Sequence, residues 1–219
     1  MTGKLIVGRG VHVEIARLAL VPIAVSAVTL AKPGVATTAA AHNLVNGQVG
    51  FFGDVEGMQP LDGQAVRVKA PAGSEFTLEG LDTTSWPDFI SGNFYAAASW
   101  LTLSKSTGYS IGGAELQSLD ATTLIDEIDQ NEAGSLSAQT FSLNSLSEDA
   151  NSAAMEIVEA AAFAREYLLW RIRLKGGAQR ILRAAPSVPG EELTRKELGT
   201  STLSTVVKGR ILRLPAVGA

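Results

Sequence analysis

The chain has 219 residues, of which 46% are hydrophobic and 6% aromatic, with a formal net charge of −4 and no cysteine. The lack of cysteine excludes disulfides and thiolate metal sites, and a mildly acidic chain is poorly suited to gripping nucleic acid. Many Ala, Val, Leu, Ile, Gly and Thr residues favour short strands and turns over a helical bundle. His12 and His42 are the two histidines and lie far apart in sequence, so no metal site is expected.

The N-terminal part predicts a half-buried strand and then a strand–turn–strand unit. Apolar and polar residues alternate from Val11 to Ala16, which places His12 on the exposed face. Residues 18–31 are almost wholly apolar, and three alanines at 39–41 follow, a pattern that mimics a secretory signal peptide. Pro22 and the β-branched residues favour strands, and the apolar stretch is shorter than the roughly 20 residues of a membrane span.

Residues 23–97 predict a small, mostly antiparallel β-unit. Short apolar runs alternate with turns, and the dipeptides at 46–47 (Asn-Gly) and 62–63 (Asp-Gly) are strong turn signals. Residues 66–69 and 76–79 alternate apolar and polar side chains, as half-buried strands do.

This unit resembles a β-module that recurs in bacteriophage tail and tail-fibre proteins, in the run AHNLVNGQVGFFGDVEGMQPLDGQAVRV and the later SEFTLEGLDTT and FISG. Asn43 and Asp62 stand where the module commonly has Gly and Asn, and both can occupy turns. The resemblance implies no chemistry, and the glycines are most simply turn residues with positive φ. The residues that match the module are His42, Leu44, Gly47, Gly57, Met58, Leu61, Gly63, Phe76, Leu78, Asp82, Thr83, Ser91 and Gly92.

An acidic segment lies between the later strands, one of which is predicted over residues 135–146. A calcium loop starting at Asp129 fails, because Thr140 stands where a bidentate Glu is needed. A catalytic carboxylate pair lacks any supporting motif. A solvated acidic loop or strand face needs nothing further and is favoured. The acidic residues of this segment are Asp126, Glu127, Asp129 and Glu132.

A helix and a basic hairpin follow. Residues 147–149 (Ser-Glu-Asp) are typical of a helix N-terminus, and Met155 lies in an apolar stripe with Phe163 beside it. Residues 168–175 then alternate apolar with basic side chains before a turn at Gly176 and Gly177. The basic face lacks the interleaved aromatics of single-strand binders, so we expect it to be solvated or to pair with acids of a neighbouring copy.

The whole order of elements resembles the major tail tube proteins of long-tailed (siphovirus) bacteriophages. The resemblance covers about residues 107–214, in the segments TTLIDEIDQNEAGSLSAQTFSLNSL, RIRLKGGAQRILRA and GTSTLSTVVKGRILRL. It lies in order and spacing more than in fixed residues. Ala184 or Ala185 stands where the family often has Gly after the hairpin.

The resemblance implies a mainly β protein with a β-sandwich or barrel tail-tube domain and one flanking helix. The tail-tube domain would comprise residues 1–22, with an N-terminal arm, and 98–219, and residues 23–97 would form the inserted module. Six copies would form a ring, and stacked rings would form the tube through which the genome is ejected.

The resemblance also implies the partners and the location. The tape-measure protein and then DNA would occupy the lumen without specific binding, and tail terminator and distal tail proteins would close the ends. The protein would belong to the virion, after assembly in the host cytoplasm. An acidic lumen would repel phosphate, so Asp126, Glu127, Asp129 and Glu132 are candidates for lumen or inter-ring positions.

Two other classes remain open. A tail-fibre or surface-binding β-protein would be a trimer with an exposed aromatic groove, and a secreted bacterial β-protein would be cleaved after Ala41. An enzyme is not expected, because the chain has no GxSxG, HExxH, P-loop or dinucleotide-binding motif. We accordingly expect no catalytic residue, cofactor, metal or membrane partner.

Overall fold

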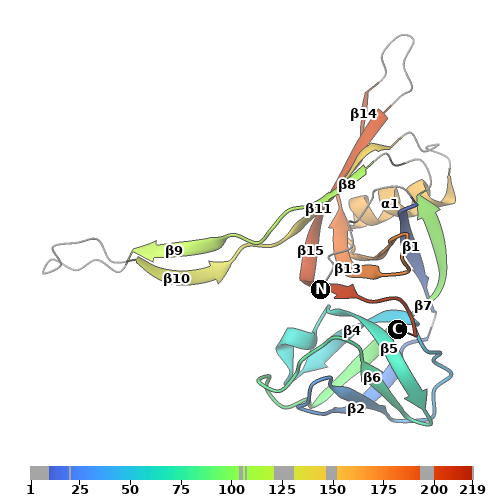
Figure 1. Cartoon of the computed structure of the whole chain (residues 1–219), viewed down its shortest axis with the longest axis vertical. Coiled ribbons are helices and arrows are strands. Elements are labelled where there is room, and N and C mark those ends of the chain that lie inside the picture. Colours follow the sequence, from blue (N-terminus) through green and yellow to red (C-terminus); the bar gives the residue numbers. More distant parts are fainter. Residues whose placement is uncertain are drawn as a thin grey trace, which may run out of the picture.

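The computed structural model of the chain describes residues 10–19, 21–103, 106, 108–120, 131–146, 152–192 and 200–218. This part of the chain is mainly β, as predicted, with one α-helix, α1 (Ala153–Ala164), and one 3-10 turn, η1 (Gln59–Leu61) (Figure 1). The strands are β1 (His12–Leu18), β2 (Ile23–Val28), β3 (Val35–Thr38), β4 (Val49–Glu56), β5 (Ala65–Ala72), β6 (Glu75–Leu78), β7 (Ser91–Leu103), β8 (Gly108–Ile111), β9 (Leu116–Asp120), β10 (Asn131–Leu136), β11 (Thr140–Leu146), β12 (Leu168–Arg173), β13 (Gln179–Pro186), β14 (Gly190–Glu192) and β15 (Thr200–Leu214).

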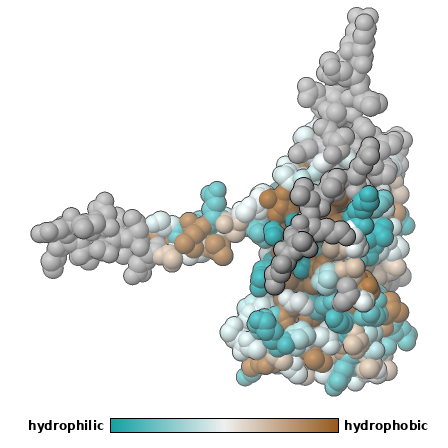
Figure 2. Space-filling view, in the orientation of Figure 1, coloured by the Kyte–Doolittle hydropathy of each residue, from teal (hydrophilic) through white to brown (hydrophobic). Residues whose placement is uncertain are grey.

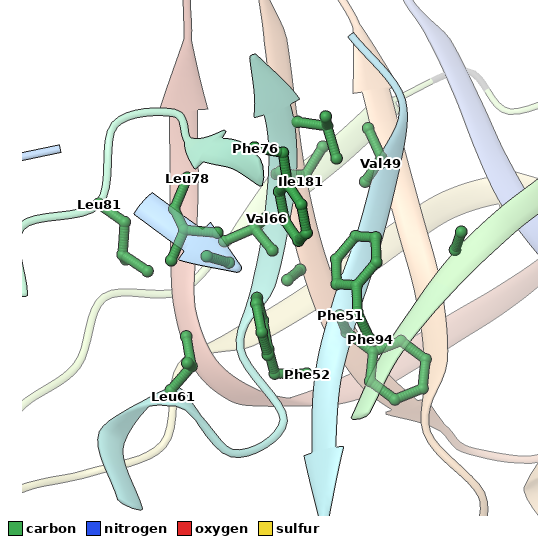
Figure 3. Packing of buried hydrophobic residues seen from close by; sticks show 14 of the residues in the cluster. Val49, Phe51, Phe52, Leu61, Val66, Phe76, Leu78, Leu81, Phe94 and Ile181 are labelled. Atoms are coloured by element: carbon green, nitrogen blue, oxygen red, sulfur yellow. The ribbon is translucent and has the colours of Figure 1, made fainter. Parts of the chain in front are cut away.

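Six strands close into a small antiparallel barrel in the order β2-β3-β6-β5-β4-β7, because β7 also pairs with β2. Closure leaves no unpaired edge in this unit. Its interior is packed with phenylalanines: the ring centroid of Phe94 lies 5.2 Å from that of Phe52 and 5.1 Å from that of Phe76 (Figure 3). The predicted turns are present, with Gly47 and Gly63 at φ of 84° and 77°.

The long strand β7 joins the barrel to a second sheet. Residues 91–96 of β7 pair with barrel strands β2 and β4, whereas residues 97–103 pair with β1. From there the antiparallel sheet continues as β7-β1-β12-β13-β15-β11-β8. One continuous strand therefore belongs both to the barrel and to the sheet above it (Figure 1).

The seven-stranded sheet is strongly curved. Its edge strands are β7 and β8, and five peptide units link Leu103 to Gly108. Five residues reach at most about 18 Å, whereas the edges of a flat seven-stranded sheet lie about 29 Å apart. The sheet must therefore wrap so that these two strand ends approach each other.

A second core fills the curved sheet beneath α1. Trp170 is fully buried there, 5.6 Å between ring centroids from Phe141, and its indole N–H donates to the carbonyl of Ala184 at 3.2 Å. Met155 and Val158 of α1 pack into the same cluster. Helix α1 thus covers this core with its apolar face, as the apolar stripe predicts.

The helix begins later than predicted. Its N-cap is Ser152, whose hydroxyl accepts from the amide of Met155 at 3.3 Å, so the helix begins at Ala153. The predicted start at residues 147–149 lies outside the described residues. Phe163 is 75% exposed, because the helix turns that side away from the core.

The single strand predicted over residues 135–146 is two strands. Residues up to Leu136 belong to β10 and pair with β9, whereas residues from Thr140 belong to β11 and pair with β15 and β8. Leu136 and Ala138 are apolar at even positions, whereas Phe141 and Leu143 are apolar at odd positions, so the alternation changes phase at residues 139–140, next to the change of partner.

Candidate assembly surfaces

The β9–β10 hairpin projects from the body as an isolated two-stranded ribbon (Figure 1). Its pairing runs from Leu116 opposite Leu136 at the base to Asp120 opposite Asn131 at the outer end. Leu116, Leu119 and Leu136 are 59%, 57% and 65% exposed, and Figure 2 shows hydrophobic surface on the ribbon. An isolated hairpin is marginally stable in water, and exposed aliphatic side chains mark contact surfaces. The ribbon is therefore a candidate surface for contact with another chain.

Of the four acidic residues predicted for lumen or inter-ring positions, three lie in sequence between β9 and β10, and the fourth lies in β10. Asp126, Glu127 and Asp129 lie outside the described residues. Glu132 belongs to β10, where its backbone pairs opposite Leu119, and its side chain also lies outside the description. The N-terminal arm is outside it too, up to residue 9. The roles of these segments stay predictions.

The curved sheet has two open edges. β8 pairs with β11 on one side, and residues 97–103 of β7 pair with β1 on one side; within the described residues neither has a partner on its other side. An open edge presents unpaired backbone N–H and C=O groups that can pair with a strand of another chain. Both edges are thus available for contacts between copies.

A groove of about 960 Å³ lies where the hairpin meets the body. Its walls are the hairpin base (Ala114 and residues 136–139), residues 206–214 of β15, Tyr167 and Gly80. Of the lining residues that the structure describes, none is acidic and three are basic residues of β15: Lys208, Arg210 and Arg213.

The charges of this groove are only partly neutralised by the chain itself. Lys208 Nζ lies 2.9 Å from the carboxylate of Asp62 in the barrel. Within the described residues, Arg210 and Arg213 form no ion pair. Both side chains are exposed, so the groove presents two free guanidinium groups to solvent.

Neither a metal centre nor a membrane helix is found in the part of the chain that the structure describes. No group of three or more His, Cys, Asp or Glu side chains is arranged to hold a metal ion there. None of the described helices is long and apolar enough to cross a bilayer.

Comparison with known protein families decides between the classes of structural protein. A family profile described as phage tail tube protein (TTP) matches residues 56–213, which is more than half of the chain. The chain belongs to the phage tail tube protein family. No curated protein is significantly similar to it in sequence. The match begins at the end of β4 and ends in β15, so it includes barrel strands β5, β6 and β7, the β9–β10 hairpin and nearly all residues that line the groove of this tail tube protein.

Family membership defines the general role. This tail tube protein is a structural protein of a phage tail and a component of the virion, and its family is structural rather than enzymatic. Self-assembly into a tube with other tail components is what the family implies, which agrees with the open edges and the exposed ribbon.

The barrel of the tail tube protein is held to the curved sheet by buried polar contacts. The Gln64 side chain donates to the carbonyl of Arg210 at 3.0 Å and accepts from its amide at 2.8 Å. Fully buried Arg67 donates to Glu79 at 2.6 Å and to the carbonyl of Pro215 at 2.8 Å. These contacts fix the last strand, and with it one wall of the groove, against the barrel.

A third arginine lies in the same interface. The guanidinium of Arg183, on β13, sits 3.9 Å from the ring centroid of Phe51 in the barrel and 5.5 Å from that of Tyr167. Burial lowers the pKa of Arg183, although the nearby Asp62 carboxylate opposes this shift. Stacking on aromatic rings is the contact that a partly desolvated guanidinium makes well.

The basic face of the β12–β13 hairpin pairs within its own chain, so the predicted pairing with a neighbour's acids is wrong for two arginines. Glu14 is buried and accepts from Arg171 Nε at 2.7 Å and from Arg173. The guanidinium of Arg171 also lies 3.9 Å over the ring of Trp100. Because β1 and β12 are neighbours, Glu14 stands directly opposite Arg171, a relationship invisible in the sequence pattern. His12 on the same strand is exposed, as predicted.

Proposed function

We propose that copies of this tail tube protein close into rings of six, and that the rings stack into the tube of a long-tailed phage through which the genome is ejected. The observation that carries the proposal is the curved sheet with two open edges, β8 and residues 97–103 of β7, in a member of a tube-forming family. Pairing the β8 edge of one copy with the β7 edge of the next is a head-to-tail contact, which generates a closed ring when the rotation between copies is right.

The β9–β10 hairpin would join one ring to the next. Its exposed leucines need covering, and it extends away from the sheet (Figure 1). In the tube, Asp126, Glu127, Asp129 and Glu132 would occupy the lumen or the contact between rings. The lumen would hold the tape-measure protein and later DNA without specific binding, and terminator and distal tail proteins would close the ends. Assembly would take place in the host cytoplasm.

The proposal divides the chain into two units. The closed barrel of β2 to β6 and residues 91–96 of β7 supports residues 23–97 as an inserted module. The remainder, residues 1–22 and 98–219, would be the tail-tube domain. The barrel has no open edge to offer a neighbour, so ring closure would rest on the tail-tube domain.

Electron microscopy of the purified full chain tests the proposal. Rings with six-fold class averages, or tubes of stacked rings, are the expected result. A monomer that persists at every concentration, measured by mass photometry and sedimentation, would refute ring formation. Trimers would instead favour the tail-fibre or surface-binding alternative.

A further inference from the structure

The groove beside β15 concentrates positive charge in an otherwise acidic protein. Its described lining contains Lys208, Arg210 and Arg213 and no acidic residue, whereas the chain as a whole carries a net charge of −4. Arg213 also stands directly opposite Arg180 in the β13–β15 pairing. Like charges directly opposite each other destabilise a sheet, and no ion pair relieves either arginine within the described residues. This arrangement calls for an anionic partner from outside the subunit.

The groove is apolar as well as basic. Leu136 and Val206 line it and are 65% and 51% exposed, and the half-exposed ring of Tyr167 lies beside them. A fitting occupant must therefore bring aliphatic side chains together with carboxylates. Duplex DNA brings phosphates but no aliphatic side chains, so it complements the basic part of the surface better than the apolar part.

One segment of the chain has this composition. Residues 124–129 read Leu-Ile-Asp-Glu-Ile-Asp, three aliphatic residues among three acids. From Asp120 to Glu132 the sequence contains five acidic residues and no lysine or arginine. Charge and hydrophobicity of this segment are thus complementary to those of the groove.

We propose that the groove of one copy binds residues 124–129 of a second copy, with Arg210 and Arg213 neutralised by the acids of that segment. The inference rests on the proposed tube. The base of the hairpin, at Ala114 and Leu136, forms a wall of its own groove, while Asp120 and Asn131 pair at the outer end. Four residues of strand, about 14 Å, separate the base of the hairpin at Leu116 from Asp120 at its outer end, which favours the groove of another copy over the hairpin's own groove. This binding assigns the acids to a contact between copies rather than to the lumen.

Disulfide trapping tests the contact directly, because the natural chain has no cysteine. Full-length Asp129→Cys and Arg210→Cys proteins are mixed and oxidised, and a disulfide forms when the two Cα atoms come within about 7 Å. The mixture is expected to give a heterodimer. As the matched control, Asp129→Cys is mixed with Lys175→Cys, an exposed lysine outside the groove, and is expected to give about tenfold less.

Charge exchange provides the second arm. Arg210→Glu with Arg213→Glu is expected to abolish tubes, and adding Asp126→Arg with Asp129→Arg to the same chain is expected to restore them. Both arginine side chains are exposed, so the substitutions leave the cores intact. The inference would be overturned if the double-glutamate protein formed tubes as the wild type does and the cysteine mixture gave no heterodimer. The proposed function would survive that result. Failure of the wild type to form rings or tubes would remove both.

A third outcome concerns nucleic acid. Binding of labelled duplex DNA that is lost in the double-glutamate protein, again without a heterodimer, would overturn the proposal in favour of a nucleic-acid site. Heterodimer formation that added duplex DNA does not displace supports the contact between copies.

Discussion

The side-chain amide of Gln64 pairs with the backbone of Arg210 as a neighbouring strand would. Its Nε2 donates to the Arg210 carbonyl and its Oε1 accepts from the Arg210 amide, at 3.0 and 2.8 Å. The preceding residue, Gly209, has φ of +76°, and a Cβ there would lie 2.8 Å from Gln64 Oε1. Here β15 shifts register against β13, between Ile181 and Arg183. A barrel side chain therefore satisfies the bend in the strand that lines the groove.

Replacing Gln64 is expected to destabilise the protein. Gln64→Leu keeps the approximate size but leaves the amide and carbonyl of Arg210 without their partners, which costs about 1–3 kcal/mol. Urea unfolding of the unassembled protein measures the loss. The matched control is Gln59→Leu at an exposed glutamine of the same unit, expected to change the free energy of unfolding by no more than about 0.5 kcal/mol. Equal effects of the two substitutions would contradict the role of Gln64.

Removing Glu14 is expected to be more costly. Glu14→Ala leaves the mostly buried guanidinium of Arg171 without its carboxylate, and breaking a buried pair in this way costs about 3–5 kcal/mol. Burial already lowers the pKa of Arg171, with the Glu14 bond opposing that shift. Thermal and urea unfolding provide the readout. Arg173→Ala removes the half-exposed partner and is expected to cost about 1 kcal/mol or less. The reverse order would refute this account.

Acid is expected to weaken the barrel through Glu79. Burial pushes the pKa of its carboxyl upward, but the bond to Arg67 outweighs burial, so the pKa lies below its ordinary value of 4.5. A depressed folded-state pKa gives stability that is present above the unfolded value and is lost as pH falls through the folded value. Glu79→Gln should therefore reduce the change of unfolding free energy with pH below about pH 5.

Asp82 serves as the comparison for this acid dependence. Hydrogen bonds from Lys32 and Thr84 lower the pKa of its exposed carboxyl to about 2. Asp82→Asn should therefore remove a pH dependence confined to about pH 4 to pH 2, and above about pH 4 it should lower stability by an amount that does not vary with pH. If Glu79→Gln keeps the full wild-type slope near pH 4, the assigned role of the Glu79–Arg67 pair is wrong.

Ring closure can be tested at the β8 edge. The amide of Gly112 donates to Thr140, so alternation along the strand points the amide of Ile111 away from β11. Ile111→Pro removes this outward donor, about 1 kcal/mol of hydrogen bonding at every contact, without removing a bond to β11. Ile111→Ala removes the same side chain and keeps the donor. Electron microscopy should show fewer rings for the proline variant than for alanine; equal assembly would exclude pairing through this edge.

Local patterns predicted much of the fold. Alternation identified the strands around Val13, Val66 and Phe76, and the turn dipeptides identified the positive-φ glycines at 47 and 63. The order of elements predicted the tail tube family, which the match over residues 56–213 confirms. Helix α1 was also predicted, but its cap was placed too early, because Ser147 and Asp149 are of residue types favoured at the N-cap, as is Ser152.

The contacts that define the groove and the interior were not predictable in the same way. The phase change at residues 139–140 marks the break between β10 and β11 but not the partners of either strand, and the alternation of β1 places the buried Glu14 on its polar face. The sequence around Arg210 and Arg213 does not show that these arginines lack acidic partners in the folded chain. Each case depends on which strands become neighbours, and alternation within one strand contains no information on its partners.

By itself, the amino-acid sequence determined the strand class of this protein, its turns and its family, because side-chain periodicity and turn chemistry act over a few residues. Only the tertiary structure decided which charged and polar side chains find a partner within the chain and which remain unpaired. Gln64 meets Arg210 across 146 positions and Glu14 meets Arg171 across 157, and such pairs arise from long-range strand pairing rather than from local propensity.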